Sequence, residues 1–355
     1  MSAVSNPLVS ICIPTFNRAD SLRETLDDVC GHDYEPVEII ISSDNGSTDN
    51  TEEICRARAK ADPRIQYIRH PQGIGLYQNH NCLLDVCRGE FICFVHDHDT
   101  RVSTITPDYV TFMMEHPEVG VVCSDWDVID QEGVVLGHRD YQVPEITPGL
   151  TFIEQTIRSG RSSIGVPGAM IRRSALADTR FDEQGPLGFG DFEVWFRVAE
   201  RTSVGHLKRR LWAWRQEPNA QSVRTIASLV GDYDKVITTY CDGYARRWPT
   251  ERRRTEHWKR LARRYIFWAL AYEVGLHFKR RQDRSASPTL FEILPYRLSE
   301  SEFEQVLDRM QEYQAGLDQA VARLLLKAFL WSGFTWPLGW ITRHYASMRI
   351  MLGLR

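Results

Sequence analysis

Apolar and polar positions follow two different patterns along this chain. Through the first two-thirds, short runs rich in β-branched residues are separated by segments whose apolar residues recur every three or four positions. The runs predict strands and the segments between them predict helices. Strands are expected at 8–14, 37–42, 65–70, 90–97, 119–130, around 166–176 and at 206–215. This alternation predicts an α/β fold with a mixed, mostly parallel sheet flanked by helices.

Four helices are predicted between the strands. After the first strand, residues Asn17 to Asp20 would cap a helix with Leu22, Leu26 and Val29 on its apolar face. A second helix would begin at about Thr51. Two later segments, NHNCLLDVCRG and GDFEVWFRVAERT, also have helical spacing.

From about Leu229 the pattern is helical throughout. Two apolar stripes recur at helical spacing and would pack against the α/β body or against each other. The first contains Trp258, Leu261, Tyr265, Trp268, Tyr272 and Leu276, and the second contains Phe303, Val306, Leu307, Met310, Tyr313, Leu317, Val321 and Leu324. We therefore predict an α/β domain over residues 1–228 and a helical C-terminal region over 229–355.

Charge and cysteine content suggest the environment of the protein. The net charge of −4 divides into −13 for residues 1–245 and +9 for residues 246–355, which suggests two surfaces with different partners. The eight cysteines form no C-x-x-C pair and several lie inside apolar runs, as buried thiols in a reducing compartment do. No signal peptide is visible at the N-terminus, so we expect a cytoplasmic protein.

Candidate binding residues lie where three predicted strands end. These are Pro14 and Thr15, then Asp44 and Asn45, then Asp97, His98 and Asp99. Ligands of open α/β sheets bind at the carboxyl ends of the strands, so a binding site is expected there. Asp44 and Asn45 could bond a nucleobase or ribose, or they could only cap the next helix.

The stretch FICFVHDHDT raises the question of which side chains would hold a metal. On an extended strand, Asp97 and Asp99 would project to one face, and His96 and His98 to the other. Two carboxylates suit Mg²⁺ or Mn²⁺ bound together with diphosphate oxygens. Zinc would need the histidines and two further ligands, and no H-E-x-x-H or H-x₃₋₅-H spacing supplies them. We predict the two aspartates as ligands, with the histidines beside the site.

Several motifs resemble those of one enzyme family. VSICIPTFNR, IIISSDNGSTDNTEE and the segment from Asn81 through FICFVHDHD resemble the N-terminal half of the family 2 glycosyltransferases. VPGAMIRRSAL resembles that family's acceptor-side strand, GFGDFEVWFRVAE its E-D-x-D-x-W-x-R helix, and WRQEPNAQS its closing loop. The likeness covers roughly residues 8–224 in the family's order. It implies the GT-A fold and an inverting, metal-dependent enzyme that uses a nucleotide-diphosphate sugar.

The resemblance implies roles for the residues at the strand ends. Pro14, Thr15, Asp44 and Asn45 would bind the nucleobase and ribose of a UDP- or dTDP-type donor, although the family often has a second aspartate at the position of Asn45. Asp97 would also contact the nucleotide sugar.

The metal and diphosphate would lie next to the nucleotide. Asp97 and Asp99 fall on the family's D-x-D motif, which binds Mn²⁺ or Mg²⁺. In an alternative register with D-x-D-D members, the metal carboxylate would fall on His98. Arg215 could clamp the diphosphate.

The resemblance also assigns a catalytic base. Asp191 matches the aspartate of the family's E-D pair, whose glutamate is Gly190 here, and Glu193 is the fallback base. The acceptor side would include Trp126, Gly168 and Trp195, with the tryptophans stacking on a sugar or only packing.

These roles together predict one activity. The chain would transfer one sugar, with inversion, to a hydroxyl of a glycan or glycolipid in surface polysaccharide or glycoconjugate synthesis. The Q-x-x-R-W motif of processive members is absent. A non-catalytic sugar-nucleotide or glycan-binding descendant and a nucleotidyltransferase are the alternatives. Donor sugar, acceptor, linkage and oligomeric state are not encoded in these patterns.

The basic C-terminal region suggests a membrane surface. Residues 246–284 carry 13 Lys/Arg against four Asp/Glu, with Trp248, Trp258 and Trp268 among them, and 324–345 is apolar and Trp-rich. Lys327 and Pro337 interrupt that run, so a spanning helix is not expected. We expect either peripheral binding to an anionic cytoplasmic membrane face or a helical subdomain with a solvated basic face, and no nucleic acid.

Overall fold

The computed structural model describes residues 6–31, 34–43, 47–186, 188–216 and 226–282, with the backbone alone at 226–227, Trp268 and 271–282. Contacts divide the chain into two compact units. One is Met1–Thr156 with Arg161–Ala220, and the other is Ile157–Gly160 with Gln221–Arg355. The predicted domain boundary at residue 228 stays a prediction, because residues 217–225 lie outside the described part.

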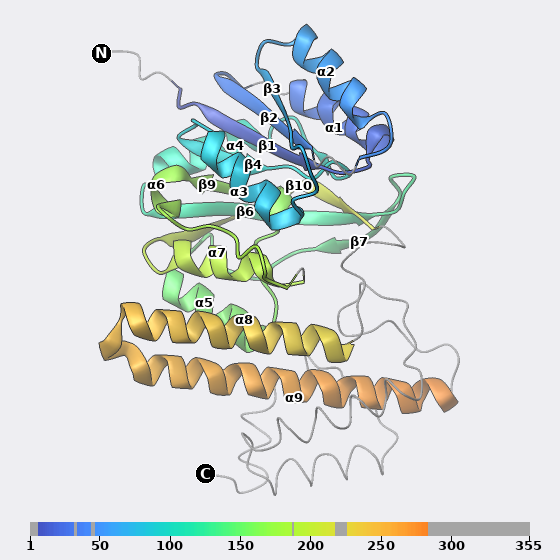
Figure 1. The fold of residues 1–355 in the computed structure, drawn as a ribbon. Coiled ribbons are helices and arrows are strands. Elements are labelled where there is room, and N and C mark those ends of the chain that lie inside the picture. The colour runs from blue at the N-terminus through green and yellow to red at the C-terminus, as the bar shows by residue number, and fades with distance from the viewer. Residues whose placement is uncertain (1–5, 32–33, 44–46, 187, 217–225, 283–355) are drawn as a thin grey trace, which may run out of the picture. The chain divides into compact units, whose positions relative to one another are not determined.

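The first unit is built on a mixed sheet (Figure 1). In the described residues, its strands follow the order β3-β2-β1-β4-β9-β6-β10-β5, with β7 paired to β6 and β8 to β10. Strands β3, β2, β1 and β4 are parallel neighbours, as are β6 and β10, whereas β9 runs antiparallel between β4 and β6. The strands are β1 (Val9–Thr15), β2 (Val37–Ser43), β3 (Ile65–Arg69), β4 (Phe91–Phe94), β5 (Thr100–Arg101), β6 (Val119–Ile129), β7 (Val135–Arg139), β8 (Ile146–Thr147), β9 (Met170–Arg172) and β10 (Ser203–Arg215).

Helices connect these strands and bury their apolar faces. Leu22, Leu26 and Val29 of α1 (Ala19–Cys30) are buried, as predicted, in a core shared with α2 (Thr51–Ala61), α4 (Ile105–Glu115) and the central strands. The remaining helical elements of this unit are α3 (Leu76–Val86), α5 (Gly149–Ser159, whose last residues belong to the second unit), η1 (Val166–Gly168), α6 (Arg173–Leu176) and α7 (Gly190–Ala199).

The structure corrects two local predictions. The cap of α1 does not come from Asn17–Asp20: the N–H of Ala19 donates to Asp49 Oδ2 at 2.9 Å, and Asp49 also accepts the Thr51 N–H at the start of α2. Asp49 thus caps both helices from one loop. The expected strand around 166–176 is only the three residues of β9 between η1 and α6.

In the second unit, α8 (Ile226–Arg247) and α9 (Arg252–Gln282) lie side by side, joined through η2 (Pro249–Glu251) (Figure 1). Trp258 is wholly buried and its ring lies 5.1 Å from that of Tyr244. Leu261 and Tyr265 are also buried, so the first apolar stripe packs as predicted where its side chains are described. The second stripe and the segment 324–345 lie outside the described residues.

Candidate active site

The predicted strand-end site lies at one edge of the sheet. Thr15, the last residue of β1, pairs with Ser43, the last residue of β2, and β4 ends at Phe94, opposite Cys12 of β1. The Thr15 hydroxyl is buried and has no hydrogen-bond partner among the described residues, so a ligand could supply one. Pro14 precedes it in the same buried strand. Asp44 and Asn45 lie outside the described residues, and their roles stay predictions.

The acidic cluster after β4 is a turn and not a strand. Regular pairing stops at Phe94, and the N–H of Asp99 donates to the carbonyl of His96 at 3.4 Å. The alternation expected of an extended strand is therefore wrong for residues 96–99. In a turn, aspartate and histidine side chains can converge on one point.

The Asp97 carboxylate is bonded to protein donors. Its Oδ2 accepts the backbone N–H of Phe16 at 3.4 Å, which connects the turn to the end of β1. Its Oδ1 lies 3.0 Å from His98 Nδ1. Asp97 is buried, so these contacts fix the orientation of the His98 ring.

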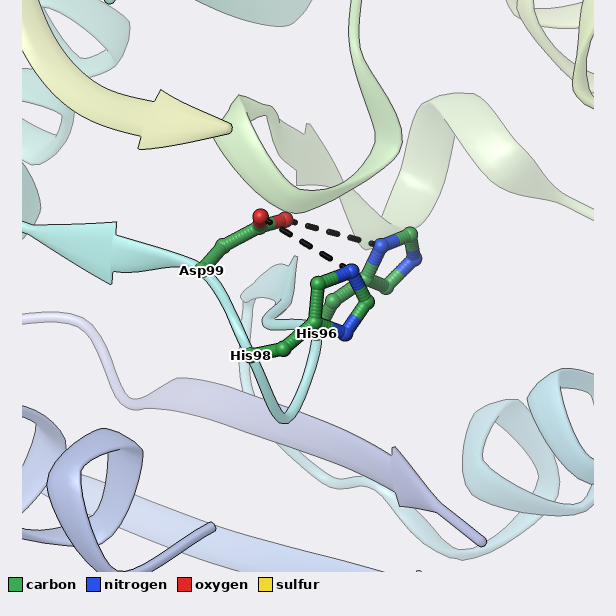
Figure 2. Close-up of side chains that lie close together, drawn as sticks. All are labelled: His96, His98 and Asp99. Carbon is green, nitrogen blue, oxygen red and sulfur yellow. Dashed lines mark ion pairs between the residues drawn. The ribbon is translucent and has the colours of Figure 1, made fainter. Parts of the chain in front are cut away.

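Asp99, His96 and His98 form a compact group of metal-ligating side chains (Figure 2). Asp99 Oδ2 lies 3.7 Å from His96 Nδ1, and Asp99 Oδ1 lies 3.9 Å from His98 Nε2. Burial raises the pKa of Asp99 to about 6 and lowers that of His96 well below its usual value. Among the described residues, this is the one such group of three in which the ligand atoms all lie within 4.8 Å of one another.

Arg215 holds this turn in place. Its backbone N–H donates to Asp99 Oδ1 at 2.9 Å, and its Nε donates to the carbonyl of His98 at 2.9 Å. Its Nη1 and Nη2 reach the carbonyl of Gln131 and the carboxylate of Glu24. The guanidinium therefore positions the turn in this structure, and a diphosphate would have to compete with these acceptors.

The predicted base, Asp191, lies in the first turn of α7. The indole N–H of Trp195 donates to Asp191 Oδ2 at 2.9 Å. Burial raises the pKa of the carboxyl to about 6, although that hydrogen bond stabilises its charged form. Trp195 is wholly buried, so neither face of its ring is open to a sugar, and it acts on the site by holding Asp191.

Tyr77 occupies the space next to Gly190 where the resemblance places a glutamate. A Cβ atom on Gly190 would lie 2.4 Å from the Tyr77 hydroxyl, which donates to the carbonyl of Pro186 at 3.0 Å. One turn along α3, the ring of His80 lies 6.1 Å from that of His96. Helix α3 therefore contacts both the metal-ligating group and the start of α7. Glu193, the fallback base, lies half-buried two residues beyond Asp191.

We expect Gly190→Ala to destabilise the protein by about 1–3 kcal/mol, because the new methyl group would overpack the Tyr77 ring. Urea unfolding measures the change in the free energy of unfolding. In a Tyr77→Ala background the same change should cost much less, since the space is then open. Equal costs in the two backgrounds would show that Tyr77 does not fill this position.

The predicted acceptor-side residues lie around an aromatic cluster. The ring of Trp126, on β6, stacks on Trp212 of β10 at 4.9 Å, and the Arg139 guanidinium lies over it at 5.7 Å. A Cβ atom on Gly168 would lie 2.0 Å from Trp212 Nε1, so only glycine fits there. Trp126 is half-buried and could still present part of its ring to an acceptor.

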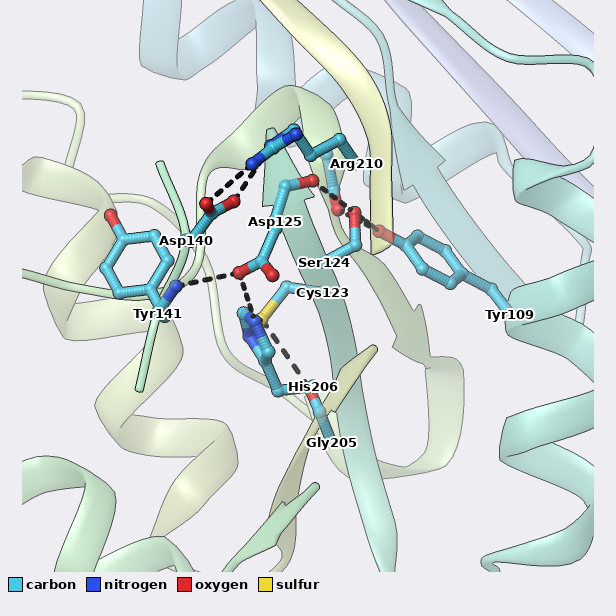
Figure 3. A network of polar contacts seen from close by, with 10 residues as sticks. Tyr109, Cys123, Ser124, Asp125, Asp140, Tyr141, Gly205, His206 and Arg210 are labelled. Carbon is cyan, nitrogen blue, oxygen red and sulfur yellow. Dashed lines mark hydrogen bonds and ion pairs between the residues drawn. The ribbon is translucent and has the colours of Figure 1, made fainter. Parts of the chain in front are cut away.

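A buried polar network between β6 and β10 was not expected from the sequence (Figure 3). Asp125 Oδ1 lies 2.8 Å from His206 Nε2, and His206 Nδ1 lies 3.3 Å from Cys123 Sγ. Such a Cys–His–Asp row has the order of a nucleophile triad. Burial raises the pKa of Cys123 to about 12, so its thiol stays protonated and the row connects the two strands.

Comparisons with solved structures define the class of fold. S. aureus TarS 1-349 in complex with UDP-GlcNAc matches with a TM-score of 0.61 at 15% identity, over 90% of this chain and 86% of that one. The mannosyltransferase PcManGT from Pyrobaculum calidifontis, solved with GDP-Man and Mn²⁺, gives 0.52 at 16% identity, over 93% and 86%. The fold is that of the GT-A glycosyltransferases, as predicted.

Sequence comparisons support the same class. Residues 10–180 match the model of Glycosyl transferase family 2. An uncharacterized protein of Mycobacterium tuberculosis is 27% identical over 248 residues, which is 66% of this chain and 76% of that protein. The GalNAc(5)-diNAcBac-PP-undecaprenol beta-1,3-glucosyltransferase of Campylobacter jejuni is 36% identical over 98 residues, 27% of this chain and 31% of that enzyme. The predicted class, a glycosyltransferase, is confirmed.

Proposed function

We propose that this protein transfers a single sugar, with inversion at the anomeric carbon, from a nucleotide-diphosphate sugar to a hydroxyl of a glycan or lipid-linked acceptor. One observation carries the proposal. Asp191, a carboxylate with a raised pKa, lies in the first turn of α7, and α3 contacts both the start of α7 and the metal-ligating turn after β4. A lipid-linked acceptor is supported by the name of the Campylobacter relative, which includes an undecaprenol-linked substrate.

Asp191 has the properties that the base of such a reaction needs. It would accept the proton of the acceptor hydroxyl while that oxygen attacks the anomeric carbon from the face opposite the departing diphosphate. A pKa of about 6 leaves the carboxylate ionised at neutral pH and still basic enough to take a proton. The Trp195 N–H fixes the orientation of the carboxylate through Oδ2.

The turn after β4 fits a divalent cation. Asp99 Oδ2 is buried and has no hydrogen-bond partner among the described residues, and two imidazoles face the same carboxylate. Asp99, His96 and His98 would hold the ion, which supplies charge neutralisation for the leaving diphosphate when bound. Arg215 and Asp97 keep these three side chains oriented.

A donor panel tests the activity. The full-length protein with MnCl₂ is incubated with UDP-, dTDP- and GDP-sugars, and the phosphate products are separated by ion-exchange chromatography. We expect release of a nucleoside diphosphate from one donor class. When inorganic pyrophosphate is added, formation of a nucleoside triphosphate and a sugar 1-phosphate would indicate a nucleotidyltransferase. Donor binding without any product would indicate a binding protein.

The pH profile of kcat tests the Asp191–Trp195 contact. The wild type should lose activity as the pH falls below about 6, because protonated Asp191 cannot accept a proton. Trp195→Phe removes the donor that stabilises the carboxylate, so the acidic limb should move to higher pH. A variant with lower kcat but an unchanged profile would show that Trp195 only packs.

We also propose that the protein binds peripherally to the cytoplasmic face of the membrane. In the second unit, Arg252, Arg253 and Arg260 are exposed, and so is Trp248, with 45% of its surface accessible. Trp258, expected at the interface, is instead buried in the helix pair. Among the described residues, none of the helices combines the length and apolar character needed to cross a bilayer.

Vesicle co-sedimentation tests this surface. The full chain should bind vesicles containing anionic lipid, with binding that weakens in salt and is lost when residues 324–355 are removed. Arg252→Gln, Arg253→Gln and Arg260→Gln together should lower the affinity by roughly two orders of magnitude, at about 1 kcal/mol for each charge. Arg56→Gln, on α2, is the matched control. A full chain that ignores anionic vesicles at low salt contradicts the proposal.

A further inference from the structure

The side chains around Asp99 differ from an all-carboxylate site in one respect. The Asp97 carboxylate is hydrogen-bonded by Phe16 and His98, whereas Asp99 has one oxygen without a hydrogen-bond partner among the described residues. That oxygen, Asp99 Oδ2, faces His96 Nδ1 at 3.7 Å. The carboxylate best prepared for a cation is therefore Asp99, and its neighbours are imidazoles.

The orientation of the His98 ring also indicates a cation site with imidazole ligands. When its Nδ1–H donates to Asp97 Oδ1, the lone pair is on Nε2, the atom 3.9 Å from Asp99 Oδ1. A carboxylate that orients a histidine through one ring nitrogen, and so directs the other at an ion, is a recurring arrangement in metal sites. Asp97 would then be a positioning residue. One ligand atom each of His96, His98 and Asp99 lies within 4.8 Å of the others, so all three side chains can reach one ion (Figure 2).

We infer that this site takes a transition-metal ion through His96, His98 and Asp99, and that it discriminates against Mg²⁺. This inference rests on the proposed function only for the role of the ion in sugar transfer, and not for the choice of ion. Mg²⁺ prefers oxygen ligands in strict octahedral geometry and gives up its waters reluctantly. Imidazole nitrogen favours ions later in the first transition row, so affinity should rise from Mn²⁺ to Co²⁺ and Zn²⁺.

Metal titration of the full chain without donor tests the inference. Calorimetry with CoCl₂ and MgCl₂ measures the two affinities, and the visible absorption of bound Co²⁺ reports nitrogen ligands. We expect Co²⁺ to bind at least tenfold more tightly than Mg²⁺. His98→Asp should weaken Co²⁺ binding at least tenfold without weakening Mg²⁺ binding, because it exchanges a nitrogen ligand for oxygen.

Two further variants keep the test interpretable. His96→Gln should also weaken Co²⁺ binding and change its spectrum, and it serves if His98→Asp does not fold in a thermal melt. His116→Gln, at the end of α4, is the matched control and should bind Co²⁺ as the wild type does. Equal affinities for Co²⁺ and Mg²⁺, or a Co²⁺ spectrum unchanged in both site variants, would overturn the inference.

The proposed function can fail separately. A chain that shows the Co²⁺ preference but releases no nucleoside diphosphate from any donor leaves the metal site in place and overturns sugar transfer. A chain that transfers sugar equally well with either ion, and binds both alike, overturns the metal preference alone.

Discussion

Asp191→Asn should lower kcat by about two to four orders of magnitude while donor binding is retained, the usual scale for a general base. Asparagine keeps the shape of the side chain and can still accept the Trp195 N–H through its oxygen, but it cannot take the acceptor proton. Glu193→Gln is the matched control because it removes a carboxylate from the same turn of α7. Near-normal turnover in Asp191→Asn, with loss in Glu193→Gln, would transfer the role to Glu193.

The same substitution should stabilise the fold at neutral pH. The pKa of Asp191 is about 6 in the folded protein, above the value near 3.9 expected in an unfolded chain. The folded state therefore binds this proton more tightly than the unfolded chain does. As the pH rises from about 4 to about 6, the free energy of unfolding of the wild type falls. Removing the charge should raise the free energy of unfolding by about 1–3 kcal/mol at pH 7.5 and by less than about 0.5 kcal/mol at pH 4. Thermal melts at the two pH values measure this difference.

Asp99→Asn should remove metal-dependent turnover. The amide keeps an oxygen for the backbone N–H of Arg215, so the turn should stay folded, but it no longer offers a carboxylate to a cation. Loss of charge neutralisation at the leaving diphosphate should cost several kcal/mol, or more than two orders of magnitude in kcat. Asp99→Ala should have the same effect on turnover.

Asp97→Asn is the comparison that separates ligand from positioning residue. It weakens the contact that orients His98 but leaves Asp99 and both imidazoles in place, so turnover should fall less and excess metal should restore part of it. The metal dependence of kcat in the two variants is the measurement. If Asp97→Asn loses metal and Asp99→Asn keeps it, Asp97 is the ligand and the assignment made here is wrong.

The buried strands were predictable because their side chains lie in a continuous core. LVSICIP and VEIIIS are rich in β-branched residues. The strands observed at these positions, β1 and β2, are buried along their whole length, as strands covered by helices on both faces are. Helix α4 was missed, although Ile105, Tyr109 and Phe112 have helical spacing. Helix α3 begins at Leu76, three residues before the predicted start, because Gly75 takes a positive φ of 80° and ends the preceding loop.

The candidate site was predictable in position but not in geometry. Strand order alone places the end of β1 and the turn after β4 at one edge. The sequence did not predict the end of β4 at Phe94, because the apolar run in FICFVHD continues for one more residue, Val95. The contact between Tyr77 and Gly190 joins residues far apart in sequence, so no local pattern could reveal it.

Proton NMR of the sugar released from the accepted donor shows whether Asp191 acts as the base of a single displacement. An enzyme that uses Asp191 as base in a single displacement gives, at early times, a product with the anomeric configuration opposite to that of the donor. We expect this inverted anomer from the wild type and no such product from Asp191→Asn. A product that first appears with the configuration of the donor would contradict this expectation.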